Sequence, residues 1–307
     1  MALTSTEIEI LRQIADIEKT PQGAYNIRKN GEAEGRASTA NIQIIPKVDK
    51  PGIDIKIKDG TKNESVHIPV ILTESGLTDM VYNDFYIGDD CDVVIVAGCG
   101  IHNSGCETSQ HDGIHTFYIG KNTKLRYVEK HYGEGEGTGK RILNPVTKVF
   151  VGENSSLTLE STQIKGVDST KRQTDIVVRK NAEAIINEKL MTHGNQTAVS
   201  EMEIVLLEEG ANGRVLSRSV ATDSSEQIFY PKMTGKASCF GHVECDSIIM
   251  DNAKISSIPA IVAESPDSVL VHEAAIGKIA GEQLLKLMTL GLDEKQAEER
   301  ILKGFLN

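Results

Sequence analysis

The sequence predicts a mainly β protein: a parallel β-helix, or solenoid, preceded by a helix and followed by a helical hairpin. Three observations support this prediction. A short motif recurs at a spacing typical of solenoids, a capped amphipathic segment precedes it, and two more amphipathic segments follow it. The 307 residues suffice for one large solenoid. We expect an N-terminal helix in 1–24, the β-helix core domain in 25–275 and a C-terminal helical segment in 276–307.

The repeated motif places apolar residues on both sides of a short polar turn. Its copies begin at Ile87, Ile119, Val151, Val178, Leu207 and Ile249. In the first five copies the turn residues are Asp90, Asn122, Asn154, Asn181 and Gly210, which are 32, 32, 27 and 29 positions apart. Asp, Asn and Gly tolerate left-handed backbone, and Val, Ile and Leu suit strands, so each copy predicts strand, turn and strand. A β-sandwich is the alternative, although sandwich turns are usually roughly 8 to 12 residues apart.

The N-terminal segment 4–19 has the signals of a helix. Thr4 and Glu7 have the spacing of a capping box, and the segment Pro21–Gly23 would end the helix. One face carries the apolar stripe Ile10, Leu11, Ile14 and Ile17.

The C-terminal tail from about Ala280 predicts two short helices. Gly291 is placed to end the first helix, and Asp293 with Gln296 is placed to begin the second. Their apolar residues are Leu284, Leu287 and Met288 in the first helix and Ala297, Ile301, Leu302 and Phe305 in the second. A hairpin of this size is marginal alone, so we expect it to dock on the solenoid or on another chain.

Charge and composition narrow the class of protein. The net charge of −11, from 33 basic and 44 acidic residues without a basic block, disfavours nucleic acid and anionic membranes as partners. There is no apolar run of about 20 residues and no signal-like N-terminus, which predicts a cytoplasmic protein. The five cysteines are an odd, scattered set, so we expect free thiols.

Two segments near the C-terminal end of the repeats concentrate reactive side chains. In a strand over Cys239–Asp246, Cys245 would share one face with Cys239, while His242 and Glu244 would lie on the other. Buried, inert thiols are the alternative. The apolar run 269–277 contains His272 and Glu273, whose burial would be costly without partners, so we expect a ligand or proton-transfer role for them. The alternative is a hydrogen-bonded histidine at a sheet edge beside a solvated glutamate.

A Gly-rich stretch offers a second set of metal ligands. The side chains are Cys99, His102, Cys106, His111 and His115, of types that hold zinc or iron. The alternative is a polar loop with incidental histidines. Acidic residues at 89, 90 and 92 leave open a β-helix enzyme acting on polysaccharides, although acids are common in turns.

The C-terminal half contains a series of short segments in a distinctive order and spacing: Val243–Ser247, Pro259, His272–Ala274, Glu282–Leu284 and Gly304–Leu306. In this order and spacing the chain resembles the SufB/SufD family of iron-sulfur cluster assembly proteins, and the resemblance extends more loosely over roughly 95–307. It implies a right-handed parallel β-helix flanked by helices, and C-terminal helices that dock on an ABC-type ATPase, SufC. The docking residues would include Leu284, Met288, Ile301 and Phe305.

The resemblance also implies the roles of individual residues. Cys245 and Glu273 match cluster assembly residues of SufB-type members, and His272 matches the functional histidine of SufD-type members. Cys99 matches the cysteine that receives sulfur from a cysteine desulfurase or other sulfur donor. Since one chain has all of these, we expect a homodimer in which Cys245 and Glu273 of one copy face His272 of the other.

The function expected from this resemblance is that of a scaffold, not of an enzyme. It would receive persulfide sulfur and iron, pass sulfur by exchange from Cys99 to Cys245, and build a transient iron-sulfur cluster at the dimer interface. The cluster type and any use of flavin are not indicated by these residues. The alternative is a structural or regulatory partner of the ATPase without a cluster, with zinc in the stretch 99–115.

Overall fold

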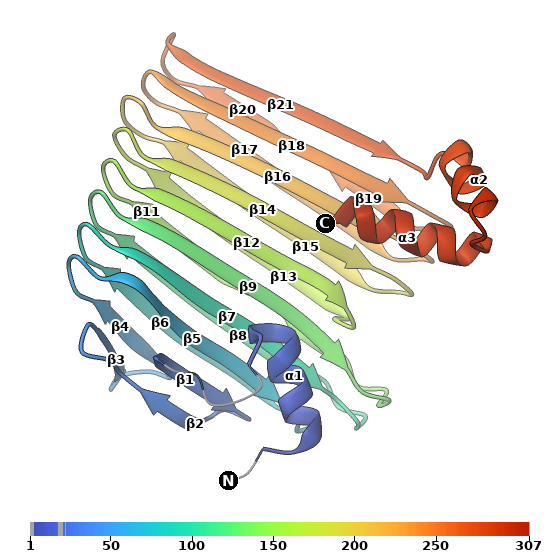
Figure 1. The fold of residues 1–307 in the computed structure, drawn as a ribbon, viewed down its shortest axis with the longest axis horizontal. Coiled ribbons are helices and arrows are strands. Elements are labelled where there is room, and N and C mark those ends of the chain that lie inside the picture. Colours follow the sequence, from blue (N-terminus) through green and yellow to red (C-terminus); the bar gives the residue numbers. More distant parts are fainter. Residues whose placement is uncertain (1–2, 18–20, 22, 307) are drawn as a thin grey trace.

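The computed structural model describes all residues except 1–2, 18–20, 22 and 307. Figure 1 shows the predicted β-solenoid, of about eight turns, in which two sheets of stacked strands face each other. Sheet A runs in the order β2 (Glu32–Ala37), β1 (Ala24–Lys29), β5 (Lys62–Leu72), β7 (Asp92–His102), β9 (Lys124–Glu134), β12 (Ser156–Lys165), β14 (Glu183–Thr192), β16 (Asn212–Ala221), β18 (Cys239–Ile249) and β21 (Ser268–Gly277).

Sheet B forms the opposite wall of the solenoid. Its order is β3 (Ile42–Pro46), β4 (Gly52–Ile57), β6 (Thr78–Ile87), β8 (Ser109–Ile119), β10 (Arg141–Leu143), β13 (Ser169–Val178), β15 (Thr197–Leu206), β17 (Glu226–Gly235) and β19 (Lys254–Ser257), with β11 (Val146–Val151) between β8 and β13 and β20 (Ala260–Ala263) beside β17. From β4 onward every strand pairs in parallel with its counterpart in the next coil. Parallel stacking of this kind is why the sequence repeats at coil length.

The predicted turn residues lie at one corner of the solenoid, where the chain passes from sheet B to sheet A. Asp90, Asn122, Asn154, Asn181 and Gly210 all have positive φ, between 51° and 74°. The side chains of the first four form a ladder, in which each Asn amide donates to the Asp or Asn side chain of the preceding coil over 3.2–3.4 Å. The sixth copy of the motif, at Ile249, lies at the opposite corner, where Asp251 has φ of 54°.

The interior of the solenoid is apolar on one side and polar on the other. Next to the ladder corner, Phe85 stacks on Phe117 with ring centroids 4.2 Å apart, and Tyr127 lies 4.7 Å from Phe117. These rings belong to a core of buried aliphatic and aromatic side chains that runs through the coils. Toward the opposite corner many inward positions carry carboxylates, histidines, hydroxyls or thiols, next to a smaller apolar cluster that includes Val70, Cys99 and Ile101. The polar half of the interior is the part that concerns function.

The N-terminal helix packs on the outer face of sheet A (Figure 1). α1 (Ser5–Ala15) has the predicted capping box, since Thr4 Oγ1 accepts from the backbone of Glu7 at 3.3 Å and Glu7 Oε2 accepts from that of Thr4 at 2.8 Å. The helix ends at Ala15, earlier than expected, because Asp16 adopts a left-handed conformation. Part of the predicted remainder, 18–20, lies outside the described residues. α1 lies over β5, β7 and β9.

The C-terminal hairpin consists of α2 (Gly281–Thr289) and α3 (Glu294–Leu306), as predicted. Gly291 between them has φ of 98°, and the second capping box is present, since Asp293 and Gln296 exchange hydrogen bonds of 2.8 and 3.1 Å. α3 packs on β16. α2 has no buried residue.

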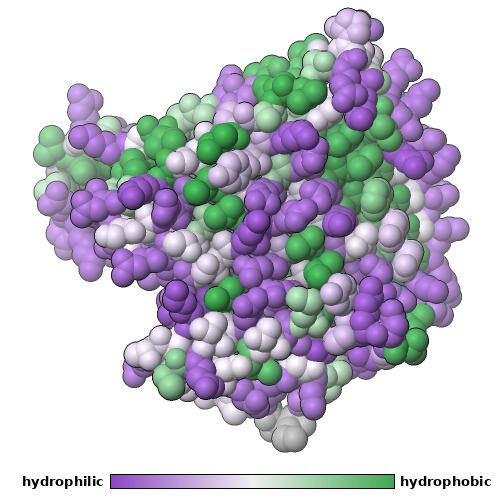
Figure 2. Space-filling model, turned by 180° about the vertical axis from the view of Figure 1, so that it is seen from behind, coloured by the Kyte–Doolittle hydropathy of each residue, from purple (hydrophilic) through white to green (hydrophobic). Residues whose placement is uncertain are grey.

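The two ends of the solenoid differ. At the N-terminal end the antiparallel strands β2 and β3 cover the edges of the two sheets. At the other end the edge strand β21 continues the parallel stack, without an antiparallel strand beyond it within the described residues. The last coil exposes apolar side chains, 37% to 55% each, at Ile258, Ile261, Val262, Val269, Val271 and Ile276. Figure 2 shows apolar side chains gathered at this upper end and on the projecting hairpin. No helix within the described part of the chain is long and apolar enough to cross a membrane.

Candidate functional site

The polar half of the interior forms a continuous line along sheet A. One inward register row contains Ala97, Glu129, Ser161, Glu188, Ser217 and Cys245, each on the next strand. The adjacent inward row contains Cys99, His131, Gln163, Leu190, Ser219 and Ser247. The polar members of both rows are buried or nearly so. Two of the predicted site residues, Cys99 and Cys245, therefore lie near opposite ends of one internal polar line.

Cys99 lies at the N-terminal end of this line in a strongly charged environment. Its side chain is 7% exposed, and burial alone would raise the pKa of the thiol, but the positive charge of His111, together with His131, lowers it to about 7. The pKa of His111 is raised to about 10, because the charges of Cys99 and Asp79 outweigh the effect of burial. At neutral pH Cys99 is thus substantially a thiolate beside an imidazolium, which is the reactive form of cysteine.

Asp79 on sheet B fixes the position of His111. Asp79 Oδ2 lies 3.1 Å from His111 Nδ1, and Arg28 approaches the same carboxylate within 2.6 Å. Burial alone would raise the pKa of Asp79, but bonds to His111 and Arg28 hold it far below its usual range. The aspartate stays ionised, so it orients the imidazole through Nδ1, while Nε2 is buried without a hydrogen-bond partner among the described residues.

Arg172 on β13 links the middle of the line. Its Nη2 donates to His131 Nδ1 at 3.1 Å, and its Nη1 lies 3.6 Å from Glu188 Oε1. Glu188 also accepts hydrogen bonds from Ser200 at 2.9 Å and from Ser217 at 3.0 Å. Because every charge here has a partner, the polar row is tolerated inside the solenoid.

Cys245 lies at the far end of the line, beside His272. The two residues are on neighbouring strands, and Cys245 Sγ is 3.7 Å from His272 Nε2. Burial raises the pKa of Cys245 to about 12 and lowers the pKa of His272, so a protonated thiol faces a neutral imidazole that can accept its proton. Cys245, Glu188, Ser217 and Ser257 help to line a cavity of about 20 Å³, enough for one small molecule such as water.

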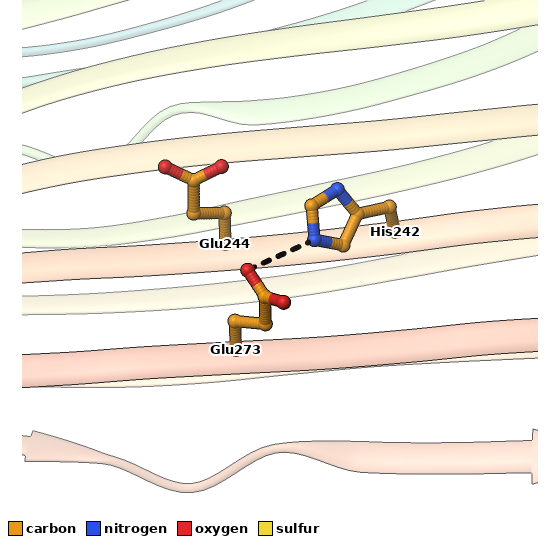
Figure 3. Close-up of side chains that lie close together, drawn as sticks. All are labelled: His242, Glu244 and Glu273. Atoms are coloured by element: carbon orange, nitrogen blue, oxygen red, sulfur yellow. Dashed lines mark ion pairs between the residues drawn. The ribbon is translucent and has the colours of Figure 1, made fainter.

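Glu273 lies on the other face of the same strands. Glu244 and Glu273 are register partners on β18 and β21, and both point outward together with His242, whose Nε2 is 3.6 Å from Glu273 Oε2 (Figure 3). The alternation predicted for Cys239–Asp246 is confirmed by the burial pattern of β18. Within one chain, therefore, His272 already accompanies Cys245, while the sheet separates Glu273 from both of them.

The five ligand types of the stretch 99–115 do not converge on one point. Cys99, His111 and His115 point into the solenoid, where His115 Nδ1 lies 2.8 Å from the Tyr127 hydroxyl group. Burial lowers the pKa of His115 to about 4. His102 lies on the outer side of the strand, 3.2 Å from Glu134, and Cys106 is exposed in the loop. The predicted five-ligand metal site is not formed, because strand alternation sends its members in different directions.

The acidic turn at 89–92 has a structural role. Asp89 accepts a hydrogen bond from the Lys121 backbone at 2.7 Å, and Asp90 accepts one from Asn122 at 3.2 Å. These contacts belong to the corner ladder.

The predicted docking residues of the hairpin differ in exposure. Met288 is 39% exposed, whereas Leu284 and Ile301 are half-buried. Phe305 packs on the chain's own solenoid, with the Arg218 guanidinium group 6.0 Å from its ring. The exposed apolar surface of the hairpin instead centres on Leu285, Met288 and Leu290 of α2 and its end, with exposures of 63%, 39% and 74%.

The distance between Cys99 and Cys245 changes one expectation. The two thiols are five strands apart in sheet A, which at about 4.8 Å per strand places them about 24 Å apart. Direct exchange of sulfur between them is therefore impossible in this conformation. The sequence analysis does not predict the polar line between them. The pattern that marks it is a charged residue at a position where strand alternation predicts an inward-facing side chain, as in Leu125, Tyr127, Glu129 and His131.

Comparisons with known proteins agree on one family. The family model described as SUF system FeS cluster assembly, SufBD core domain, matches residues 101–238 and 169–305. An iron-sulfur cluster assembly SufBD family protein of Methanocaldococcus jannaschii is 29% identical over 257 residues, which are 82% of this chain and 79% of that protein. Relatives with the same description from Archaeoglobus fulgidus and Pyrococcus horikoshii are 28% and 27% identical, over 74% and 83% of this chain. The matches cover 60% and 57% of those two proteins, so the chain spans less than two thirds of their length.

Proposed function

The chain belongs to the SufBD family of iron-sulfur cluster assembly proteins, and we propose that it is the scaffold subunit of a SUF-type assembly complex. In this proposal sulfur enters at Cys99, and a transient cluster is built at Cys245 with His272. The observation that carries the proposal is the polar line inside the solenoid, which leads from an activated thiolate to a buried thiol beside a neutral histidine.

Sulfur entry follows from the charge state of Cys99. Its thiolate attacks the outer sulfur of a persulfide on a cysteine desulfurase or other sulfur donor, and the donor's thiolate leaves. The product is a persulfide on Cys99. Conversion of that sulfur to sulfide takes two electrons, which a separate reductant of the thiol or reduced-flavin class must supply. The sulfide then travels along the polar line, since no direct exchange joins the two cysteines.

Cluster building follows from the pair of Cys245 and His272. Iron binds a thiolate, so the high pKa of Cys245 requires that the thiol lose its proton as the metal arrives. His272 Nε2, 3.7 Å away, takes that proton. The small cavity beside Cys245 leaves space for a sulfide ion at the same point. Iron and sulfide are cargo here, and the scaffold contributes the ligand and the proton acceptor.

The open end of the solenoid supports a homodimer. β21 offers an unpaired strand edge, and the apolar side chains of the last coil surround it. Pairing of two such ends about a twofold axis would bury this surface and bring both copies of the assembly site to the interface. The second copy would supply further cluster ligands.

The hairpin supports an ABC-type ATPase of the SufC kind as a further partner. α2 presents Leu285, Met288 and Leu290 without cover from the rest of the chain. This surface also favours the second candidate function, a structural partner of the ATPase that carries no cluster.

Anaerobic reconstitution with ferrous iron and sulfide tests the proposal. Wild type is expected to develop thiolate-to-iron charge-transfer bands and to retain bound iron and sulfide, and Cys245→Ser is expected to lose both. The matched control is Cys91→Ser, since Cys91 is buried at the ladder corner, away from the polar line. Absence of a cluster from folded wild type that still binds the ATPase would refute the scaffold role and leave the structural one.

A further inference from the structure

We propose that His242, Glu244 and Glu273 form a binding site for one divalent metal ion on the outer face of sheet A. Its loading with ferrous iron rests on the proposed function, but the site itself does not. The three side chains lie on the last two strands of the sheet, away from the interior polar line (Figure 3).

The geometry of the three side chains suits a single ion. One ligand atom from each residue lies within 4.8 Å of the others. Two ligands on opposite sides of an ion are about 4.2 Å apart, so only small side-chain rotations are needed. Among the residues that the structure describes, no other group of three or more His, Cys, Asp or Glu side chains converges in this way.

The pairing of two carboxylates gives an independent reason to expect a cation. Glu244 and Glu273 are directly opposite each other in the register of β18 and β21, a placement in which like charges repel. The other register neighbour of Glu244 is Leu216, and beyond Glu273 the sheet ends. Among the described residues, these two carboxylates together make one ion pair, the 3.6 Å contact of Glu273 with His242. A bound cation would neutralise both charges.

The ligand set and its position indicate the class of ion. One imidazole and two carboxylates suit ferrous iron, manganese or zinc, whereas a thiolate would favour softer metals. Three protein ligands leave open positions on the ion. Because β21 is the edge strand and the Glu273 side chain is 66% exposed, those positions face outward and toward the unpaired edge. The site is suited to an ion that arrives and leaves.

The two faces of one strand pair then have separate tasks. Glu244 and Cys245 are consecutive residues that point to opposite faces, so iron would be held outside and sulfide delivered inside. The register neighbour of Cys245 on the edge strand is Ala274, whose side chain is a single methyl group. The outer site and Cys245 thus share the last strand pair of the sheet and lie one residue apart along β18.

Metal titration of the full chain without sulfide tests the site. Mn²⁺ binding, followed by the loss of the free-ion electron paramagnetic resonance signal, and anaerobic Fe²⁺ binding, followed by equilibrium dialysis, should each give one ion per chain. Glu244→Gln and His242→Ala should each weaken binding by about tenfold or more. Asp246→Asn, which removes the same charge one step along the same face, should leave the affinity within about twofold of wild type.

Two outcomes would overturn the site: unchanged binding in Glu244→Gln, or equal weakening in Asp246→Asn. The loading role has its own test, cluster formation at limiting iron, which Glu244→Gln should slow and excess iron should restore. Equal rates in wild type and Glu244→Gln would refute loading while the scaffold function stands. A wild type that binds one ion at this site but builds no cluster would refute the scaffold function and retain the metal site.

Discussion

Replacement of His111 by Gln should move the titration of Cys99 upward by about two pH units. Its thiol has a pKa of about 7 against an ordinary 9.0, and the positive charge of His111 is the main influence that lowers it against burial. Without that charge the pKa returns to 9 or above. At pH 7 the thiolate fraction falls from about one half to about 1%, which is roughly fiftyfold.

The expected loss of reactivity is smaller than the loss of thiolate. A thiolate of higher pKa is the better nucleophile. At a Brønsted slope of about 0.45, an increase of two pKa units raises the rate constant of the thiolate itself roughly eightfold. The net rate of reaction with a small disulfide at pH 7 should therefore fall about sixfold. Above pH 9 the variant should react faster than wild type. The rates of modification of Cys99 as a function of pH, followed by mass spectrometry of its peptide, measure both effects.

His102→Gln is the matched control for this prediction. His102 is close in sequence but pairs with Glu134 on the outer side of the strand, so its loss should leave the Cys99 profile unchanged. A midpoint that stays near pH 7 in His111→Gln would refute the assignment of His111 as the activating charge. A midpoint that moves equally in both variants would refute it as well, because the effect would then be general.

Three further predictions concern packing and docking. Gly98→Ala should lower the free energy of unfolding by about 1–3 kcal/mol in a thermal melt, because a Cβ there would lie 2.3 Å from the backbone of α1. Gly277 has open space around it, so Gly277→Ala should leave the melting midpoint unchanged, and equal midpoints of the two variants would contradict this prediction. Phe117→Ala should lower the free energy of unfolding in urea by about 3–5 kcal/mol, because the ring is fully buried. Phe150 is exposed, so Phe150→Ala should lower it much less, and similar losses in both variants would argue against a core role for the Phe117 ring. Leu290→Asp should weaken binding to the ATPase in calorimetry without lowering the melting temperature, and undiminished binding would exclude α2 as the docking surface.

The corners and caps were predictable from the sequence because they depend on local chemistry. The left-handed turn residues Asp90 and Asn122 sit where the motif places them, and both capping boxes formed at the predicted residues. Strand alternation also sorted Cys245 and Glu244 onto opposite faces correctly. Each of these features involves residues no more than a few positions apart.

The arrangement of the site depends on register between coils, which local patterns do not contain. Glu273 and Cys245 were expected together, but the register between β18 and β21, which are joined by a segment containing β19 and β20, places Ala274 and not Glu273 opposite Cys245. In the same way Arg172 and Glu188 are of residue types that usually lie on the surface, and only the pairing of coils brings them into one buried network. The polar interior therefore had to be seen in three dimensions.

The unequal ends of the solenoid limit how large an assembly can become. Stacked coils could in principle add copies indefinitely, top to bottom, as in an amyloid-like fibre. Here β2 and β3 run against their neighbours and occupy the first end, and Pro46 at the close of β3 lacks a backbone donor for a further strand. A further parallel coil cannot stack on these antiparallel strands as coils stack within the solenoid, so top-to-bottom addition is disfavoured at this end. The hairpins that close the core at one end thus also oppose polymerisation, which would need that end to pair with the bare end of another copy.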